Sequence, residues 1–297
     1  MPPIAVIING AAGTGHSDTE CERLRQIFAA AGVEARVMAA GSGAELIALA
    51  QRAAEGTPRV IVAGGGDGTI NAVASVVAGT GIALGVLPLG TLNHFAKDLQ
   101  IPLALEDAAR TIAEGHTAVV DVGEVNGRIF INNSSLGLYP QIVRHRETQQ
   151  RRLGRGKWPA LAWASLTALR RSPFMKVRLH VDDVEHRYTT TFVFIGNNEY
   201  VMEGFNIGQR TRLDAAHLSL YVSHRRGRGA LILLALRALF GRLRQADDFR
   251  AHSAQCVDIE TRHARLHVAT DGEVNVMETP LTYRIRPGAL WVIVPRP

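Results

Sequence analysis

The sequence contains very little cysteine. Its 297 residues include only Cys21 and Cys256, which lie far apart and form no CxxC pair. Two distant cysteines support neither a disulfide framework nor a zinc site, so we expect a protein of a reducing cytoplasm. The amino terminus, MPPIAVIING, also lacks the basic start and the small-residue cleavage site of a signal peptide. Both features favour a cytoplasmic location.

Long hydrophobic runs are absent as well. The longest run after the amino terminus, ALILLALRALF, is short and is interrupted by Arg237. A bilayer-spanning helix needs about 20 mostly apolar residues, so the sequence predicts no transmembrane helix. Any membrane contact should therefore be peripheral. Nothing in the chain repeats at a fixed period, and no low-complexity segment is evident.

Acidic residues are outnumbered by basic ones. The formal charge is +6 and the pI is about 9.8, which predicts an anionic partner such as a nucleotide, a nucleic acid or a phospholipid surface. Aromatic residues make up only 6% of the chain. The arginine clusters have no aromatics interleaved at a recognisable spacing, so we do not expect nucleic acid to be the partner.

The first third of the chain alternates apolar runs with helical patterns. Strands are predicted at 4–9, 34–40, 59–63 and 82–88, and helices from Ser17 to about Gly32, at 44–55 and at 69–78. Continuous apolar strands between amphipathic helices are typical of a parallel sheet that is covered on both faces. We therefore predict an amino-terminal, three-layer, Rossmann-like α/β domain.

The rest of the chain reads mainly as short strands. Runs such as KVRLHVDD, RYTTTFVFIG and LSLYVSH are joined by Gly, Pro, Asp and Asn turns, a pattern that favours an antiparallel sandwich. Helical insertions are expected near 157–171 and 229–243. The predicted fold class is thus α/β plus all-β, with domains at 1–122 and 123–297. A return of the extreme carboxyl terminus to the first domain is left open.

A glycine-rich loop, GGGDGT at 64–69, follows the strand predicted at 59–63. Such a loop at the carboxyl end of a parallel strand can offer backbone amides and a helix N-terminus to an anion. Asp67 looks misplaced in this setting. It either caps the following helix or meets a polyphosphate through a divalent cation. The Walker sequence GxxxxGK[ST] does not occur, so the loop is not a standard P-loop.

Two further segments carry polar groups. In LGTLNHFAKDLQIP at 89–102, Gly90, Thr91 and Asn93 could approach phosphate or ribose oxygens, although a strand-to-helix turn with a Thr cap would look much the same. ATDGE at 269–273 offers Asp271 and Glu273. Alone, this segment could equally be an ordinary β-turn.

Together, GGGDGT, PLGTLNHFAKDLQIP and ATDGE resemble the diacylglycerol kinase catalytic family, which includes bacterial lipid kinases and sphingosine kinases and is more distantly related to NAD kinases. The resemblance implies a nucleotide-binding α/β domain, a carboxyl-terminal β-sandwich and an active site between the domains. It also implies transfer of the γ-phosphate of Mg²⁺-bound ATP to a lipid hydroxyl, with diacylglycerol as the default acceptor.

The resemblance also implies residue roles. Asp271 should be the general base, Glu273 should position metal or water, and Asp67 should organise Mg-ATP. The implied nucleotide contacts are Asn9, Gly64, Gly65, Gly66, Asp67, Gly68, Thr69, Thr91 and Asn93.

The chain departs from the family pattern in several places. Asn9 is followed by glycine instead of proline, and Ala39 and Ala40 occupy the place of a nucleotide-contacting threonine. His94 stands where many bacterial members have an aspartate. The family's LDDGxLD motif is LDAAHLSL here, which leaves Asp214 as its one acid. One carboxylate offers too few oxygen ligands, so we predict no structural magnesium ion at Asp214.

Two arginine-rich segments, near 144–157 and 225–244, are candidates for docking on an anionic membrane surface. Their alternative reading is solvated loops beside helices that pack on the sandwich. The rival functions are a NAD kinase, suggested by the shared loop and by NNE at 197–199, and a non-catalytic nucleotide- or lipid-binding protein. The sequence leaves a homodimer open.

Overall fold

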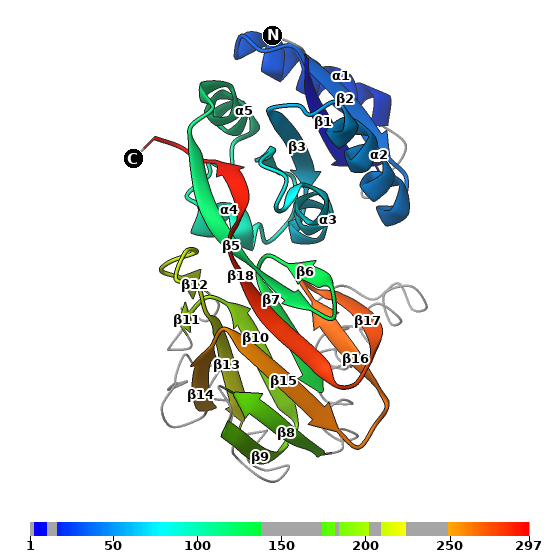
Figure 1. Ribbon diagram of the computed structural model, residues 1–297. Coiled ribbons are helices and arrows are strands. Elements are labelled where there is room, and N and C mark those ends of the chain that lie inside the picture. The colour runs from blue at the N-terminus through cyan, green and yellow to red at the C-terminus, as the bar shows by residue number, and fades with distance from the viewer. Residues whose placement is uncertain are drawn as a thin grey trace. The chain divides into compact units, whose positions relative to one another are not determined.

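The computed structural model describes residues 3–10, 17–137, 174–181, 184–201, 209–223 and 249–296 (Figure 1). These residues form two compact units. Unit 1 takes its residues from 1–122 and 287–297, and unit 2 takes its residues from 123–286. The helices expected near 157–171 and 229–243, and both arginine-rich segments, lie outside the described residues.

Unit 1 is built on a parallel sheet. Its strands lie in the order β2-β1-β3-β4-β18, and their bounds are β1 (Ile4–Asn9), β2 (Ala35–Ala40), β3 (Val60–Gly65), β4 (Ala83–Pro88) and the last part of β18 (Leu281–Ile293). β3 and β4 are buried along their whole length. Burial on both faces explains why their sequences are continuous apolar runs.

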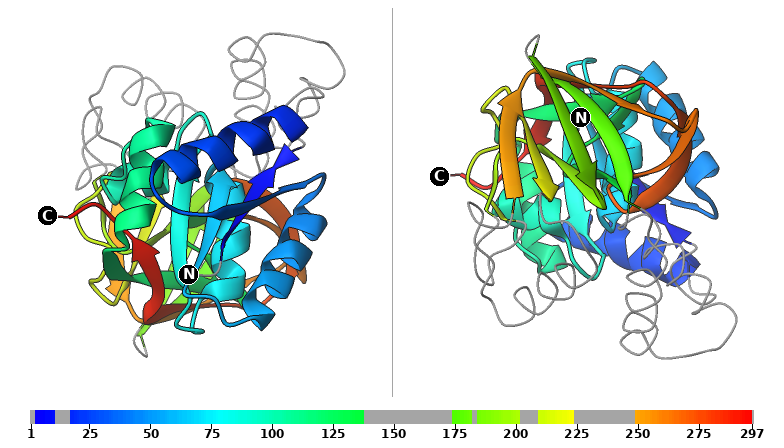
Figure 2. Two further views of the ribbon diagram at one scale, coloured as in Figure 1. Left: turned by 90° about the horizontal axis from the view of Figure 1, so that it is seen from above. Right: turned by 90° about the horizontal axis from the view of Figure 1, so that it is seen from below.

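Helices cover both faces of this sheet. α1 (Ser17–Ala30) and α5 (Leu105–Glu114) pack together on one face, and α2 (Gly43–Glu55) and α3 (Asp67–Val77) pack together on the other (Figure 2). α3 buries a stripe at helical spacing, formed by Ile70, Val73, Ala74 and Val77. The short helix α4 (His94–Asp98) follows β4. The predicted three-layer α/β domain is therefore confirmed.

Unit 2 contains two antiparallel sheets. One has the order β14-β13-β10-β7-β16-β17, and the other has the order β18-β15-β8-β9, to which β18 contributes its first part. The bounds are β7 (Asn133–Gly137), β8 (Met175–Val181), β9 (Val184–Thr190), β10 (Phe192–Asn197), β13 (Leu218–Ser223), β14 (Phe249–Ala254), β15 (Cys256–Thr261), β16 (Arg265–Thr270) and β17 (Glu273–Glu278).

Shorter strands complete unit 2. β6 (Arg128–Phe130) pairs with β5 (Thr117–Val125), which in turn pairs with β18. β11 (Tyr200–Val201) and β12 (Gln209–Arg210) form a small ribbon. The β5 and β18 strands each run from one unit into the other along the chain.

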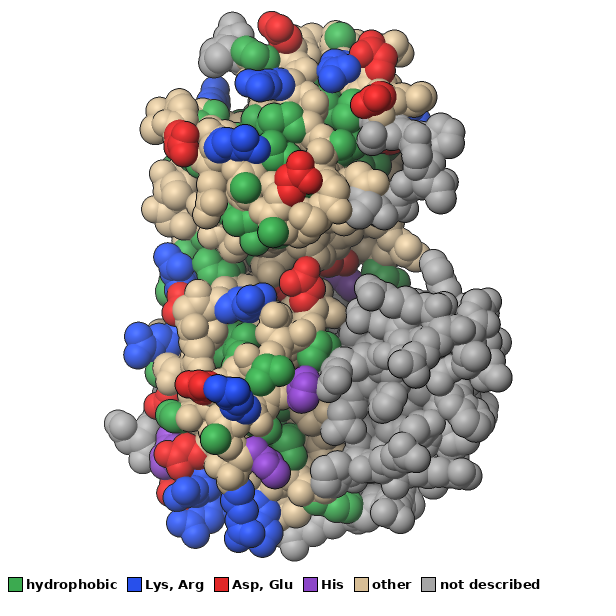
Figure 3. All heavy atoms as spheres, turned by 90° about the vertical axis from the view of Figure 1, so that its right-hand side faces the viewer, with side chains coloured by type: hydrophobic (Ala, Val, Ile, Leu, Met, Phe, Trp, Pro, Cys, Tyr) green, Lys and Arg blue, Asp and Glu red, His purple; other side chains and the backbone are tan. Residues whose placement is uncertain are grey.

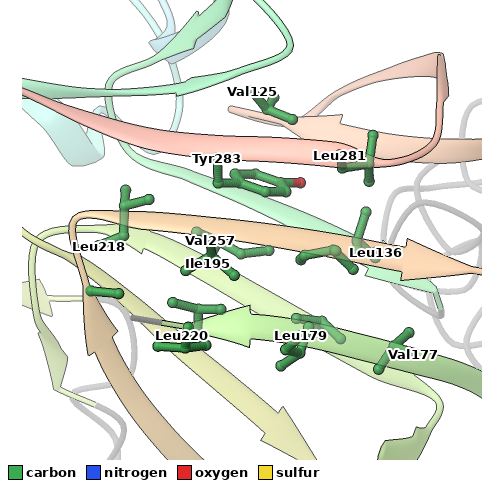
Figure 4. Close-up of a cluster of buried hydrophobic side chains, with 14 of the residues drawn as sticks. Val125, Leu136, Val177, Leu179, Ile195, Leu218, Leu220, Val257, Leu281 and Tyr283 are labelled. Atoms are coloured by element: carbon green, nitrogen blue, oxygen red, sulfur yellow. The ribbon is translucent and has the colours of Figure 1, made fainter. Parts of the chain in front are cut away.

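The core of unit 2 lies between its two sheets (Figure 4). β8 illustrates how the sequence builds it, because Val177, Leu179 and Val181 are buried while the alternate residues of the strand are more exposed. Side chains from β8 meet those from the facing sheet, such as Ile195 and Leu220. This period of two is typical of a half-buried strand. The predicted β-sandwich is confirmed.

The described surface mixes charges of both signs. On the face drawn in Figure 3, Lys and Arg side chains lie among Asp and Glu side chains. Ion pairs in unit 2 join Arg178 Nη2 to Glu260 Oε2 at 3.1 Å and Arg265 Nη2 to Glu278 Oε1 at 3.2 Å. Every helix within the described ranges is too short or too polar to cross a bilayer.

Candidate active site

The topology of unit 1 places two loops at a characteristic position. In the order β2-β1-β3-β4, the chain winds to one side after β1 and to the other side after β3. Open α/β sheets bind ligands at the carboxyl ends of the strands where this direction changes. Asn9 is the last residue of β1, and Gly64 and Gly65 are the last residues of β3. The glycine-rich loop therefore lies at the expected ligand-binding edge.

The glycines of this loop are required by close packing within unit 1. A Cβ atom on Gly65 would lie 2.5 Å from Thr69 Oγ1, and one on Gly64 would lie 2.7 Å from Ile8 Cγ2. A Cβ on Gly90 would collide with the backbone of Gly66. The loops after β3 and β4 thus touch backbone to backbone. The sequence predicts that backbone amides of this loop face an anion, which bare glycines would allow. Close packing is a second, steric reason for glycine at these positions.

Asp67 stands at the start of α3 but is not its N-cap residue. It is the first residue of α3, and Gly66 is the N-cap without a side-chain bond. Its carboxylate instead receives the backbone amides that open α4, from His94 N to Oδ2 at 3.2 Å and from Phe95 N to Oδ1 at 3.0 Å. The negative charge is favourable at both helix N-termini. One of the two alternatives predicted that Asp67 caps the helix that follows it. The carboxylate does cap a helix, and that helix is α4.

The first amides of α3 lie beside this carboxylate. The first hydrogen bond of the helix joins Ile70 N to Gly66 O at 3.0 Å. The N–H groups of the preceding residues, including Gly68 and Thr69, have no acceptor inside the helix. Such amides and the positive end of the helix dipole form a site that favours an anion.

The second loop is held by Asn93. This residue has φ 50 and is the N-cap of α4. Its Oδ1 accepts the Gly90 amide at 3.0 Å, and its Nδ2 donates to Gly90 O at 2.9 Å and to Pro88 O at 3.3 Å. Asn93 is buried, whereas Thr91 is exposed. Asn93 therefore shapes the loop with its side chain, and Thr91 is the residue of this pair that faces solvent.

Asp271 occupies a tight hairpin in unit 2. Thr270 pairs with Glu273, and the two residues between them, Asp271 and Gly272, have φ values of 47 and 85. Two consecutive positive φ values define a type I′ turn, for which Asp-Gly is a preferred sequence. The β-turn interpretation of this segment is therefore correct, but it does not describe what the Asp271 side chain does.

The Asp271 carboxylate is held by three consecutive amides. Oδ2 accepts Ile131 N at 2.8 Å, and Oδ1 accepts Asn132 N at 2.9 Å and Asn133 N at 3.0 Å. The Asp271 amide in turn donates to Asn133 O at 2.9 Å. Four hydrogen bonds thus fix the turn to the segment between β6 and β7.

Burial is the main influence on the acidity of Asp271. The residue is partly exposed, and desolvation of its carboxyl group raises its pKa to about 6. The three amides and the charge of Arg210 act in the opposite direction because they stabilise the carboxylate. A carboxylate with such a pKa is ionised near neutral pH and is a stronger proton acceptor than an ordinary aspartate.

Other acidic candidates are less constrained. Glu273 is the first residue of β17 and is exposed. Asp214 Oδ1 accepts Arg212 Nε at 3.0 Å, and this bond lowers the Asp214 pKa. Within the described ranges, no group of three or more His, Cys, Asp or Glu side chains could hold a metal ion.

Arg210 is a buried charged residue that the sequence did not indicate. Its guanidinium donates from Nη1 to Ile131 O at 2.7 Å and from Nη2 to Asn132 Oδ1 at 2.8 Å. Asn197 Nδ2 also donates to Ile131 O, at 2.9 Å. These partners are far apart in the chain, so no local pattern could have revealed the cluster.

A pocket of about 510 Å³ lies elsewhere in unit 2. Its lining includes Lys176 and Arg178 of β8, Arg187 of β9 and Glu260 of β15. Arg178 is already paired with Glu260. Asp271 does not line this pocket.

Two family models match the chain. The diacylglycerol kinase catalytic domain matches residues 3–125, and the YegS C-terminal NAD kinase beta sandwich-like domain matches residues 135–294. Their division follows the α/β and β-sandwich architecture described above.

Curated relatives and solved structures agree with these matches. The diacylglycerol kinases of Staphylococcus epidermidis strain RP62A and Staphylococcus aureus strain JH9 are 40% and 41% identical over 95 residues. Those 95 residues are 31% of this chain and 30% of each relative. A diacylglycerol kinase structure from Bacillus anthracis strain Sterne has a TM-score of 0.71 at 21% identity, and another structure from that strain reaches 0.77 at 23%. Both comparisons cover 99% of this chain and 97% of the other.

Proposed function

Because the chain belongs to the diacylglycerol kinase catalytic-domain family, we propose that it transfers the γ-phosphate of ATP to a lipid hydroxyl, with diacylglycerol or a related lipid as acceptor. One observation carries the chemical part of this proposal. Asp271 lies in the segment that resembles the family's acidic pair, and burial raises its pKa to about 6. A base with a pKa near the working pH is suited to proton transfer.

Asp271 would accept the proton of the attacking lipid hydroxyl. As that O–H bond breaks, the hydroxyl oxygen bonds to the γ-phosphorus, and the bond from this phosphorus to the bridging oxygen of ADP breaks. Oδ1 already accepts two amides, whereas Oδ2 accepts one. Oδ2 therefore has the greater remaining capacity for the substrate hydroxyl.

The loops at the ligand-binding edge of unit 1 would hold the ATP phosphates. Support comes from the first amides of α3, including those of Gly68 and Thr69, and from the helix dipole. Asp67 contributes by fixing α4 against this loop. Two points stay predictions. One is that Asn9, Thr91 and the glycines contact the nucleotide, and the other is that both units contribute to one active site.

Magnesium would enter bound to ATP. The described residues contain no cluster of three acidic, His or Cys ligands, so the phosphates would have to supply most of the oxygen ligands. Asp67 and Glu273 are the carboxylates proposed to complete its shell. When bound, the ion would neutralise charge on the phosphates.

A NAD kinase is the second candidate, because the carboxyl-terminal match is to an NAD kinase beta sandwich-like domain. The NNE segment, which suggested a NAD kinase in the sequence, gives this function less support in the structure. Asn197 and Asn198 of the NNE segment are fully buried, and they bond to Ile131 O and to the Ala215 amide. These side chains serve the fold of unit 2.

One assay separates the two acceptors. Purified protein is incubated with γ-³²P-labelled ATP and Mg²⁺, with a total lipid extract in one arm and NAD in the other. We expect label in a lipid product and none in NADP. Label in NADP alone would favour the NAD kinase, and label in neither product would favour a non-catalytic nucleotide or lipid binder.

Peripheral membrane association is part of the proposal. A kinase that acts on a lipid must reach the bilayer surface, and the arginine-rich segments near 144–157 and 225–244 would provide attraction of about 1 kcal/mol per basic residue. Neutralising both clusters should reduce sedimentation with anionic liposomes. Unchanged sedimentation would exclude these segments as the docking surface.

A further inference from the structure

Arg210 is the centre of a polar cluster inside unit 2. It is only 7% exposed, and its guanidinium lies 5.3 Å from the centre of the Tyr200 ring. Beyond its bonds to Ile131 O and Asn132 Oδ1, Nη1 also reaches Asn197 O at 3.3 Å. The guanidinium of this buried residue thus donates to oxygen acceptors on two segments of the chain.

The cluster connects Arg210 to Asp271 through one peptide group. The carbonyl of Ile131 and the N–H of Asn132 belong to the same peptide. Arg210 Nη1 donates to that carbonyl at 2.7 Å, and the N–H donates to Asp271 Oδ1 at 2.9 Å. A cation on the carbonyl side polarises the peptide and strengthens the N–H as a donor.

We propose that Arg210 is a positioning residue for Asp271, holding and polarising the Ile131–Asn132 peptide that orients the carboxylate. This inference rests on the proposed function, in which Asp271 is the base. The second contact, from Nη2 to Asn132 Oδ1, holds the side chain of Asn132, the residue whose N–H belongs to this peptide. A planar guanidinium can make both contacts at once, whereas a lysine ammonium offers a single point charge.

The first test compares Arg210→Met and Arg210→Lys. Loss of the guanidinium should lower kcat for lipid phosphorylation by roughly tenfold to a hundredfold, because a small misplacement of a reacting group has effects of this size. KM for ATP and lipid should stay within about twofold, since Arg210 is not proposed to touch either substrate. Arg210→Lys keeps the charge and should recover part of kcat.

Arg212→Met is the matched control. Arg212 lies two positions away, its side chain is 67% exposed, and it pairs with Asp214. Its replacement removes the same charge and should leave kcat unchanged. Equal losses of kcat in the Arg210 and Arg212 variants would overturn the proposal, as would a rise in KM with kcat intact.

A second test does not depend on activity. Selective ¹⁵N-asparagine labelling reports the amide proton of Asn132, whose shift should move upfield in Arg210→Met as its hydrogen bond to Asp271 weakens. The same shift should move in Asp271→Asn, and Arg210→Met should add little in that background. Arg210→Lys serves if the Met variant does not fold. An unchanged Asn132 amide in every Arg210 variant would refute the coupling.

The two proposals can fail separately. A wild-type protein that phosphorylates no lipid contradicts the proposed function, while the Asn132 amide still tests the link between Arg210 and Asp271.

Discussion

Replacement of Asp67 by alanine should loosen α4. This helix has five residues, and such a short helix is not stable alone because nucleation is unfavourable. The Asp67 carboxylate accepts the amides of His94 at 3.2 Å and Phe95 at 3.0 Å. We therefore expect the Asp67 carboxylate to make a large contribution to the free energy of local opening of α4.

The magnitude follows from these two bonds. A hydrogen bond to a charged group contributes about 1.5–3 kcal/mol, and a charge near a helix N-terminus about 0.3–1 kcal/mol. His94 is exposed, so water can replace part of what is lost. We expect Asp67→Ala to cost about 1–3 kcal/mol locally, and Asp67→Asn, which keeps one oxygen acceptor, to cost less.

Hydrogen exchange is the suitable assay, because a chain with two compact units need not unfold in one step. Amides of 94–99 should exchange roughly 5-fold to 150-fold faster in Asp67→Ala, since about 1.4 kcal/mol corresponds to a factor of ten. Glu106→Gln is the control. It removes a charge from the first turn of α5, where the side chain lies 4.0 Å from Arg23. Unchanged exchange in α4 of Asp67→Ala would refute the capping role.

Three further predictions concern packing, burial and pH. Gly65→Ala should destabilise unit 1 by about 1–3 kcal/mol through steric overlap, whereas Gly43→Ala, with open space around it, should be neutral or stabilising in thermal denaturation. Tyr283→Phe should cost about 1–2 kcal/mol in urea denaturation, because it leaves the buried Ser134 hydroxyl without its 3.0 Å partner; a loss near zero would contradict this. Lipid phosphorylation should fall about tenfold per pH unit below pH 6, where Asp271 becomes protonated, and a flat profile to pH 5 would exclude it as the base.

Much of the fold could be predicted because its signals are local. The apolar runs that become β3 and β4 and the helical stripe of α3 are each contained within one short segment. The prediction missed α5, a helix of ten residues in a stretch to which no element was assigned. It also missed α4, which is too short to show a period, and the β11–β12 ribbon, whose strands have two residues each. The predicted start of α3, at 69, is two residues late, because the glycine-rich run continues into the first turn of the helix at Asp67 and Gly68.

The candidate site was less predictable because its contacts join distant segments. The Asp-Gly pair at 271–272 indicates a turn by itself, but the amides that hold Asp271 lie about 140 positions earlier. The capping of α4 by Asp67 spans 27 and 28 positions. Arg210 carries no sequence signal at all, since its role depends on a carbonyl 79 positions away.

The central claim is that Asp271 accepts the proton of a lipid hydroxyl during phosphoryl transfer. Its most direct test is single-turnover transfer from labelled ATP to diacylglycerol vesicles by wild-type protein, Asp271→Asn and Asp258→Asn. Asp258 is the control, an aspartate of unit 2 whose carboxylate accepts the Thr282 hydroxyl at 2.6 Å. We predict that Asp271→Asn slows transfer by roughly 10²–10⁴ while ATP affinity is kept, and that Asp258→Asn transfers at the wild-type rate. Equal rates in the two variants would contradict it.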